Sequence, residues 1–230
     1  MATEKIRVVK RTFDAAPSLM CANLVDLSRD LDLFAKNHVE LLHMDIMDGH
    51  YVPNVALGPQ LCSQIAKSGC PIPQDIHLMV EEADRFVPLF AEIEPKYISF
   101  HPETSRHPMR TVQSIRAQGS KPGIAIDPAL PLDMVRHLLP EVDLVCVMTV
   151  SPGYAGQALI PWAIDKIRDL TTIRAREKLT FTIEVDGNAS WDNIPVMVNA
   201  GAQIIVLGTS SLFQAGSDLE EMLLRTNDLL

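Results

Sequence analysis

The side chains best suited to chemistry are two histidines and two aspartates in short apolar segments. His43 and Asp45 lie two residues apart in one segment, and His77 and Asp186 belong to two later ones. Two imidazoles and two carboxylates form a donor set that suits a divalent ion such as Zn²⁺, Mn²⁺, Fe²⁺ or Co²⁺. A single histidine is more often structural, so the prediction of one divalent metal ion depends on all four residues lying together.

Glycine-containing loops after three later segments form a second candidate site, suited to an anion. Glycine lets backbone N–H groups approach an anion closely, and a short helix that begins there adds partial positive charge. One loop glycine alone is more often a turn residue, but together the loops predict a phosphate site. The residues are Gly153, Tyr154, Ala155, Gly156, Gly187, Asn188, Gly208, Thr209 and Ser210.

Three methionines, Met47, Met79 and Met148, accompany these positions. Methionine usually fills irregular gaps in a core. The same residues in this place could instead form a soft apolar lining that excludes water from a reacting carbon. The sequence leaves both interpretations open.

Eight short β-rich segments recur along the chain, with helix-like stretches between most of them. The segments are Ala16–Met20, Leu41–Ile46, Asp75–Val80, Tyr97–His101, Gly123–Ile126, Leu144–Val150, Phe181–Asp186 and Ile204–Gly208. Apolar stripes at helical spacing are formed by Leu24, Leu27, Leu31 and Phe34, and by Ile164, Ile167 and Leu170. Strands and helices that alternate over 230 residues, with no linker between them, predict one (β/α)₈ TIM-barrel domain across residues 1–230.

The working residues of such a barrel lie at the C-terminal ends of its strands. Residues two apart on a strand share a face, so His43 and Asp45 point the same way. If that face is the barrel mouth, the four candidate ligands and the glycine loops border one site. An open doubly wound sheet would show a glycine-rich turn after its first strand, whereas the sequence there is Pro17-Ser18-Leu19-Met20.

The overall charge and composition exclude several classes of partner. A net charge of −9 argues against nucleic acid or an anionic membrane, which would require a basic face. No apolar run reaches the ~18 residues of a membrane helix, and the first residues lack the apolar block of a secretory signal. The four cysteines match no zinc or redox spacing. These features predict a soluble cytoplasmic protein with reduced cysteines.

Several longer blocks, from about Ala16 to Phe213, resemble the ribulose-phosphate 3-epimerase family. The blocks are Pro17–Leu19, His43–Asn54, His77–Val80, Val147–Gln157 and Glu184–Gly187. The resemblance implies an isomerase that inverts C3 of a phosphorylated ketose, with a sugar phosphate as its small-molecule partner and a homo-oligomeric assembly.

The resemblance also implies roles for individual residues. His43, Asp45, His77 and Asp186 would hold the metal ion, and an enediolate would form at the substrate. Asp45 would remove the C3 proton, and Asp186 would return one to the opposite face. Contacts to the substrate would come from Ser18, His77, Met47, Met79 and Met148, and contacts to its phosphate from the glycine loops.

Departures from the usual family pattern bear on the substrate. The usual Asp-Gly-Gly reads Asp186-Gly187-Asn188, and the segments after strands four and eight read His101-Pro-Glu-Thr and Gly208-Thr-Ser-Ser. These variants resemble the D-allulose-6-phosphate 3-epimerase branch, so D-allulose 6-phosphate and D-fructose 6-phosphate are the favoured pair. The alternative pair is D-ribulose 5-phosphate and D-xylulose 5-phosphate, and a remote alternative is a non-catalytic sugar-phosphate-binding protein. Residues 1–13 extend beyond the usual start and receive no role.

Overall fold

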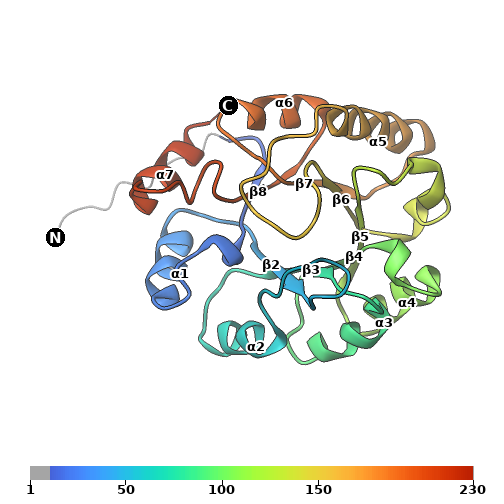
Figure 1. The fold of residues 1–230 in the computed structure, drawn as a ribbon, viewed down its shortest axis with the longest axis horizontal. Helices are drawn as coiled ribbons and strands as arrows, with labels where there is room; N and C mark the ends of the chain where they lie inside the picture. The colour runs from blue at the N-terminus through green and yellow to red at the C-terminus, as the bar shows by residue number, and fades with distance from the viewer. Residues whose placement is uncertain (1–10, 230) are drawn as a thin grey trace.

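The computed structural model describes residues 11–229, in which eight parallel strands form a ring (Figure 1). The strands are β1 (Asp14–Pro17), β2 (Leu42–Met47), β3 (Gln74–Met79), β4 (Tyr97–Phe100), β5 (Lys121–Ile126), β6 (Leu144–Met148), β7 (Thr182–Asp186) and β8 (Ile204–Leu207). From β2 to β8 each strand pairs with the next one in the chain, and β8 pairs with β1. A parallel bridge between Ser18 and His43 joins β1 to β2 and completes the ring. The predicted (β/α)₈ barrel is confirmed.

The helices surround the strands (Figure 1). They are α1 (Leu27–Lys36), α2 (Pro59–Lys67), α3 (Ala83–Phe86), α4 (Pro108–Ala117), α5 (Ala163–Glu177), α6 (Asn193–Ala200) and α7 (Leu219–Asn227). Between β5 and β6 the chain makes only two 3₁₀ turns, η4 (Leu132–Val135) and η5 (Leu139–Glu141). Pro128, Pro131 and Pro140 lie in this connection, and proline breaks the hydrogen bonding of a longer helix. Within residues 11–229, no helix has both the length and the apolar character needed to cross a membrane.

Side chains alternate between two environments along each strand, and this alternation positions the site. On β2, Leu42, Met44 and Ile46 belong to the main apolar core together with residues of the helices. The residues between them therefore face the barrel interior. Several of the interior positions are polar and buried: His43, Asp45, Asp75, His77, Ser99 and Glu184. The apolar core between strands and helices stabilises the fold. The barrel interior can therefore hold polar side chains.

The boundaries of the first strand and helix differ from those predicted. β1 begins at Asp14 and ends at Pro17, because the 3₁₀ turn η1 (Leu19–Cys21) follows it at once. α1 begins at Leu27, so Leu24 lies outside the helix and is 49% exposed rather than part of the buried stripe. The other predicted stripe is confirmed, since Ile164, Ile167 and Leu170 are buried along α5.

The predicted N-terminal extension overlaps the barrel at its last residues. Residues 1–10 lie outside the described part of the chain. Arg11 is buried and donates hydrogen bonds to the carboxylate of Glu40 (2.7 Å) and to the backbone oxygen of His38 (2.6 Å). Phe13 packs in the main apolar core. Residues 11–13 thus belong to the barrel.

Candidate active site

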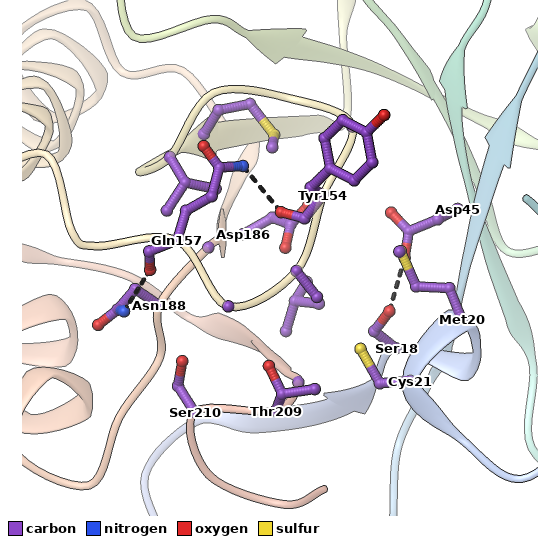
Figure 2. A pocket seen from close by; sticks show the side chains of 18 of the residues that line it. Ser18, Met20, Cys21, Asp45, Tyr154, Gln157, Asp186, Asn188, Thr209 and Ser210 are labelled. Atoms are coloured by element: carbon purple, nitrogen blue, oxygen red, sulfur yellow. Dashed lines mark hydrogen bonds between the residues drawn. The ribbon is translucent and has the colours of Figure 1, made fainter. Parts of the chain in front are cut away.

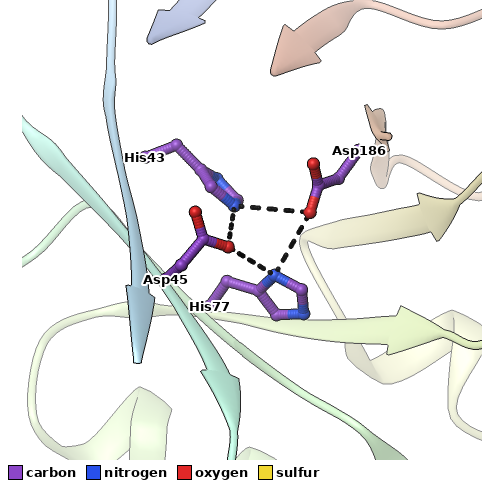
Figure 3. A group of neighbouring side chains, drawn as sticks. All are labelled: His43, Asp45, His77 and Asp186. Carbon is purple, nitrogen blue, oxygen red and sulfur yellow. Dashed lines mark ion pairs between the residues drawn. The ribbon is translucent and has the colours of Figure 1, made fainter. Parts of the chain in front are cut away.

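Three strands bring the four predicted ligands together (Figure 3). Asp45 on β2 lies beside His77 on β3 in the strand register. His43 Nε2 lies 3.4 Å from Asp45 Oδ1 and 3.9 Å from Asp186 Oδ2, at the end of β7. His77 Nδ1 lies 3.6 Å from each of the same two oxygens. One donor atom from each residue falls within 4.8 Å of all the others, which is compact enough to surround one ion.

The hydrogen bonding of this cluster fits a divalent ion. His43 Nε2 and His77 Nδ1 are buried and have no hydrogen-bond partner. Both nitrogens face carboxylate oxygens, and a buried polar atom without a partner normally costs free energy. An ion bound between these nitrogens and carboxylates would satisfy all four side chains at once, with a ligand set typical of Zn²⁺, Mn²⁺, Fe²⁺ or Co²⁺.

The charges in the cluster shift the pKa values of its members. Burial alone would lower the pKa of His43 and raise that of Asp45, but their mutual attraction outweighs burial in both. The pKa of His43 is therefore raised and that of Asp45 is lowered. Burial also opposes protonation of His77, but the nearby carboxylates of Asp186 and Asp45 outweigh it and raise its pKa. Asp45 is thus ionised at neutral pH, as a general base must be.

A layer of buried groups beneath the cluster was missed by the sequence analysis as part of the site. His43 Nδ1 lies 2.7 Å from Asp75 Oδ2, and Glu184 Oε1 lies 3.8 Å from the same nitrogen. Burial, together with the nearby charge of Asp75, raises the pKa of Glu184. His77 Nε2 lies 3.1 Å from His101 Nε2. Each candidate ligand histidine therefore has a buried partner on the ring nitrogen that faces away from the cluster.

A pocket of roughly 540 Å³, including its open mouth, lies at the C-terminal ends of the strands beside Asp45 and Asp186 (Figure 2). All of the predicted substrate contacts line it except His77, which is fully buried. They are Ser18, Met47, Met79, Met148, Gly153, Tyr154, Ala155, Gly156, Gly187, Asn188, Gly208, Thr209 and Ser210. Met20, Cys21 and Ser151 also line the pocket, although no sequence pattern pointed to them.

The positions of the three methionines are compatible with both interpretations that the sequence left open. Met47, Met79 and Met148 are at most 4% exposed, as core residues are. Each also lines the pocket. They give it apolar walls close to the two carboxylates, which strengthens electrostatic interactions there.

The loop after β6 crosses the mouth and is held on two sides. Asn54 Nδ2 donates to the backbone oxygen of Gly153 (2.8 Å) on one side. On the other side, Asn188 Nδ2 donates to the backbone oxygen of Gln157 (2.5 Å), as Figure 2 shows. Gln157 in turn donates to the backbone oxygen of Tyr154 (2.8 Å). The side-chain amide of Asn188 thus holds this loop in place, and the backbone of Asn188 borders the pocket.

The backbone after β7 requires glycine at one position. Gly187 has a φ of +117°, and a Cβ there would lie 2.6 Å from Val150 Cγ2. Asn188 also has a positive φ, of 44°, a conformation that asparagine tolerates better than most residues. This explains how asparagine can stand where the family more often has glycine.

The anion site differs from the prediction in one respect. No short helix begins after β8; the chain makes turns, with Phe213 N donating to Gly208 O (3.1 Å), and α7 begins only at Leu219. Among the described residues that line the pocket there is no lysine or arginine. Backbone N–H groups and hydroxyls such as those of Ser151, Thr209 and Ser210 are therefore the donors available to an anion.

Comparisons with known proteins agree with this arrangement. Residues 14–213 match the sequence model of the Ribulose-phosphate 3 epimerase family. Ribulose-phosphate 3-epimerase 1 of Cupriavidus necator is 40% identical over 205 residues, which cover 87% of this chain and 85% of that protein. Ribulose-phosphate 3-epimerase of Serratia marcescens is 38% identical over 200 residues, which cover 87% and 95%.

A solved structure supports the fold alone. Phosphoribosyl anthranilate isomerase from Thermus thermophilus matches with a TM-score of 0.66 at 12% identity, over 94% of this chain and 96% of that one. The sequence matches go further than the fold. They make the chain an isomerase that epimerises a carbohydrate and show that it belongs to the ribulose-phosphate 3-epimerase family.

Proposed function

We propose that the protein is a divalent-metal-dependent 3-epimerase that interconverts D-ribulose 5-phosphate and D-xylulose 5-phosphate. The relatives are named for ribulose phosphate, and the six-carbon pair favoured by the sequence variants gains no support from them. His43, Asp45, His77 and Asp186 are the proposed ligands. When bound, the ion supplies Lewis-acid polarisation of the ketose carbonyl next to C3.

The observation that carries this proposal is the pair of carboxylates, from β2 and β7, beside one pocket. Asp45 is the base that removes the C3 proton, and its lowered pKa keeps it ionised for that task. Ser18 Oγ donates to Asp45 Oδ2 (2.6 Å) and orients the carboxylate. Asp186 returns a proton to the other face of C3, which inverts the centre.

The rest of the pocket positions the substrate for this transfer. Gly187, Asn188 and the loop after β8 hold the phosphate through backbone N–H groups and hydroxyls. Met47, Met79 and Met148 exclude water around the reacting carbon, which protects the intermediate from protonation by solvent.

The test is epimerisation by purified protein loaded with Mn²⁺ or Co²⁺. We expect turnover of D-ribulose 5-phosphate with a higher kcat/KM than D-allulose 6-phosphate, and deuterium at C3 of the product in D₂O. Asp45→Asn and Asp186→Asn each remove a proton carrier, which should lower kcat by about 10²–10⁴-fold.

A matched control removes the same charge outside the pocket. Asp127 does not line the pocket, and its carboxylate accepts a hydrogen bond from Ala129 N (2.7 Å); Asp127→Asn should retain activity. A preference for the six-carbon substrate would reverse the choice of substrate and leave the two-base chemistry in place. Absence of turnover of either substrate would refute the proposed function.

A further inference from the structure

The two ring nitrogens of His77 face different parts of the molecule. Nδ1 faces the carboxylates of Asp45 and Asp186, each at 3.6 Å. Nε2 faces Nε2 of His101 at 3.1 Å, and both rings are fully buried. His101 follows β4 directly and does not line the pocket. His101 therefore contacts the candidate metal ligand His77 but does not border the pocket.

Counting protons along this contact fixes the tautomer of each ring. A neutral imidazole that offers the Nδ1 lone pair to an ion carries its proton on Nε2. His77 Nε2 must then donate to His101 Nε2, which has to accept. The proton of His101 is consequently on its Nδ1.

A carboxylate lies near His101 Nδ1, although outside hydrogen-bond distance. Glu103 Oε1 lies 3.6 Å from His101 Nδ1. Tyr51 OH donates to the same oxygen (2.9 Å), and the Tyr51 ring packs on the His101 ring with centroids 4.8 Å apart. The side chain of Glu103 is 35% exposed, whereas that of His101 is fully buried. The contacts thus run from the ligand cluster through His101 to a carboxylate at the surface.

We propose that His101 and Glu103 are positioning residues that hold His77 in the tautomer with a free Nδ1 and so set the affinity of the site for its ion. This rests on the metal site of the proposed function. The two ligand histidines are supported differently, because His43 Nδ1 meets the buried carboxylate of Asp75 directly (2.7 Å). His77 Nε2 instead contacts the neutral imidazole of His101, and the nearest carboxylate, that of Glu103, lies on the far side of the His101 ring.

The test measures Co²⁺ and Mn²⁺ dissociation constants by competition with a chelator. His101→Phe keeps an aromatic ring against Tyr51 but removes the acceptor for His77 Nε2–H, and it should weaken binding by about 10–100-fold. His101→Gln restores an acceptor oxygen and should recover most of that loss. Glu103→Gln should weaken binding less than His101→Phe, because His101 itself remains.

Ser99→Ala is the matched control. Ser99 is also fully buried, lies on β4 two residues before His101, and donates to Ile76 O (3.3 Å) rather than to His77. It should leave Co²⁺ affinity within about twofold of the unaltered protein, because its hydroxyl bonds to a backbone oxygen and to no candidate ligand side chain. The visible absorption of bound Co²⁺, which reports ligand geometry, should change in His101→Phe and not in Ser99→Ala.

The outcomes separate this proposal from the one on which it rests. Equal ion affinity in His101→Phe and the unaltered protein would overturn the positioning role and leave the metal site standing. Equal loss in Ser99→Ala and His101→Phe would also overturn it, because a loosened barrel would then explain both. If the unaltered protein bound no ion, the metal site itself would be refuted, and the positioning role with it.

Discussion

At the residue scale, the cluster places two histidines among carboxylates that favour their protonated forms. Burial opposes protonation of His43 and His77, but the carboxylates of Asp45, Asp75 and Asp186 outweigh it and raise both pKa values above 6.5. An ion binds only the deprotonated ring nitrogen. Metal binding and protonation therefore compete at the same two atoms.

This competition predicts that ion affinity rises with pH. Because both pKa values are raised, the two rings keep their protons to a higher pH than an unperturbed histidine would, and those protons must leave when the ion binds. The apparent association constant for Co²⁺ should increase by up to about tenfold per pH unit for each proton released. Isothermal titration calorimetry in buffers of different ionisation enthalpy would count those protons. An affinity that stays constant between about pH 6 and about pH 8 would contradict the prediction.

The candidate ligands could be identified from the sequence, whereas the buried residues that contact them could not. His43 and Asp45 lie two apart, so strand geometry alone places them on one face. Asp75 also lies two residues before His77, but its contact with His43 depends on the alignment of β2 and β3. The contact between His77 and His101 depends further on side-chain rotamers. Neither register nor rotamer is encoded in a local pattern.

At the scale of elements, the strands could be predicted from the sequence, but the contacts between loops could not. All eight strands could be predicted, because each is an apolar run with a helix or turn signal after it. The start of α1 was placed too early, because Leu24 continues the helical spacing outside the helix. The hydrogen bond from Asn188 to Gln157 joins loops 31 residues apart, and no spacing rule predicts it.

Gly187 offers a sharp test of the loop after β7. Gly187→Ala would strain a backbone with φ of +117° and place a Cβ 2.6 Å from Val150 Cγ2 and 2.9 Å from Val150 N. We expect a loss of about 2–4 kcal/mol in the free energy of unfolding, measured in urea, because strain and overpacking add. The KM for the sugar phosphate should rise as well, since the loop borders the pocket.

Gly216→Ala is the control for backbone strain alone. Gly216 also has a positive φ, of 79°, but a Cβ there would meet nothing within 4 Å. The control should lose about 1 kcal/mol and keep its KM. Equal losses in the two variants would show that the contact with Val150 is unimportant.

At the scale of the whole molecule, the residues that stabilise the barrel differ from those that border the candidate site. The outward side chains of the strands form the main core with the helices. The inward ones form smaller clusters and the polar layer beneath the pocket. The net charge of −9 is compatible with binding an anion, because the pocket offers backbone N–H groups and hydroxyls instead of basic side chains. We propose that the whole chain folds as one domain around this arrangement.

Removal of the ion should therefore lower the stability of the entire barrel. The four candidate ligands come from β2, β3 and β7, so the ion would join strands that are not all neighbours in the ring. An ion at about 100 times its Kd stabilises the folded state by about 2.7 kcal/mol. For a chain of this size, that corresponds to a rise in Tm of roughly 5–11 °C, in one cooperative transition. Asp186→Asn, which lacks one ligand carboxylate, should gain much less from Co²⁺. An equal Tm with Co²⁺ and with a chelator would contradict an ion bound across these strands.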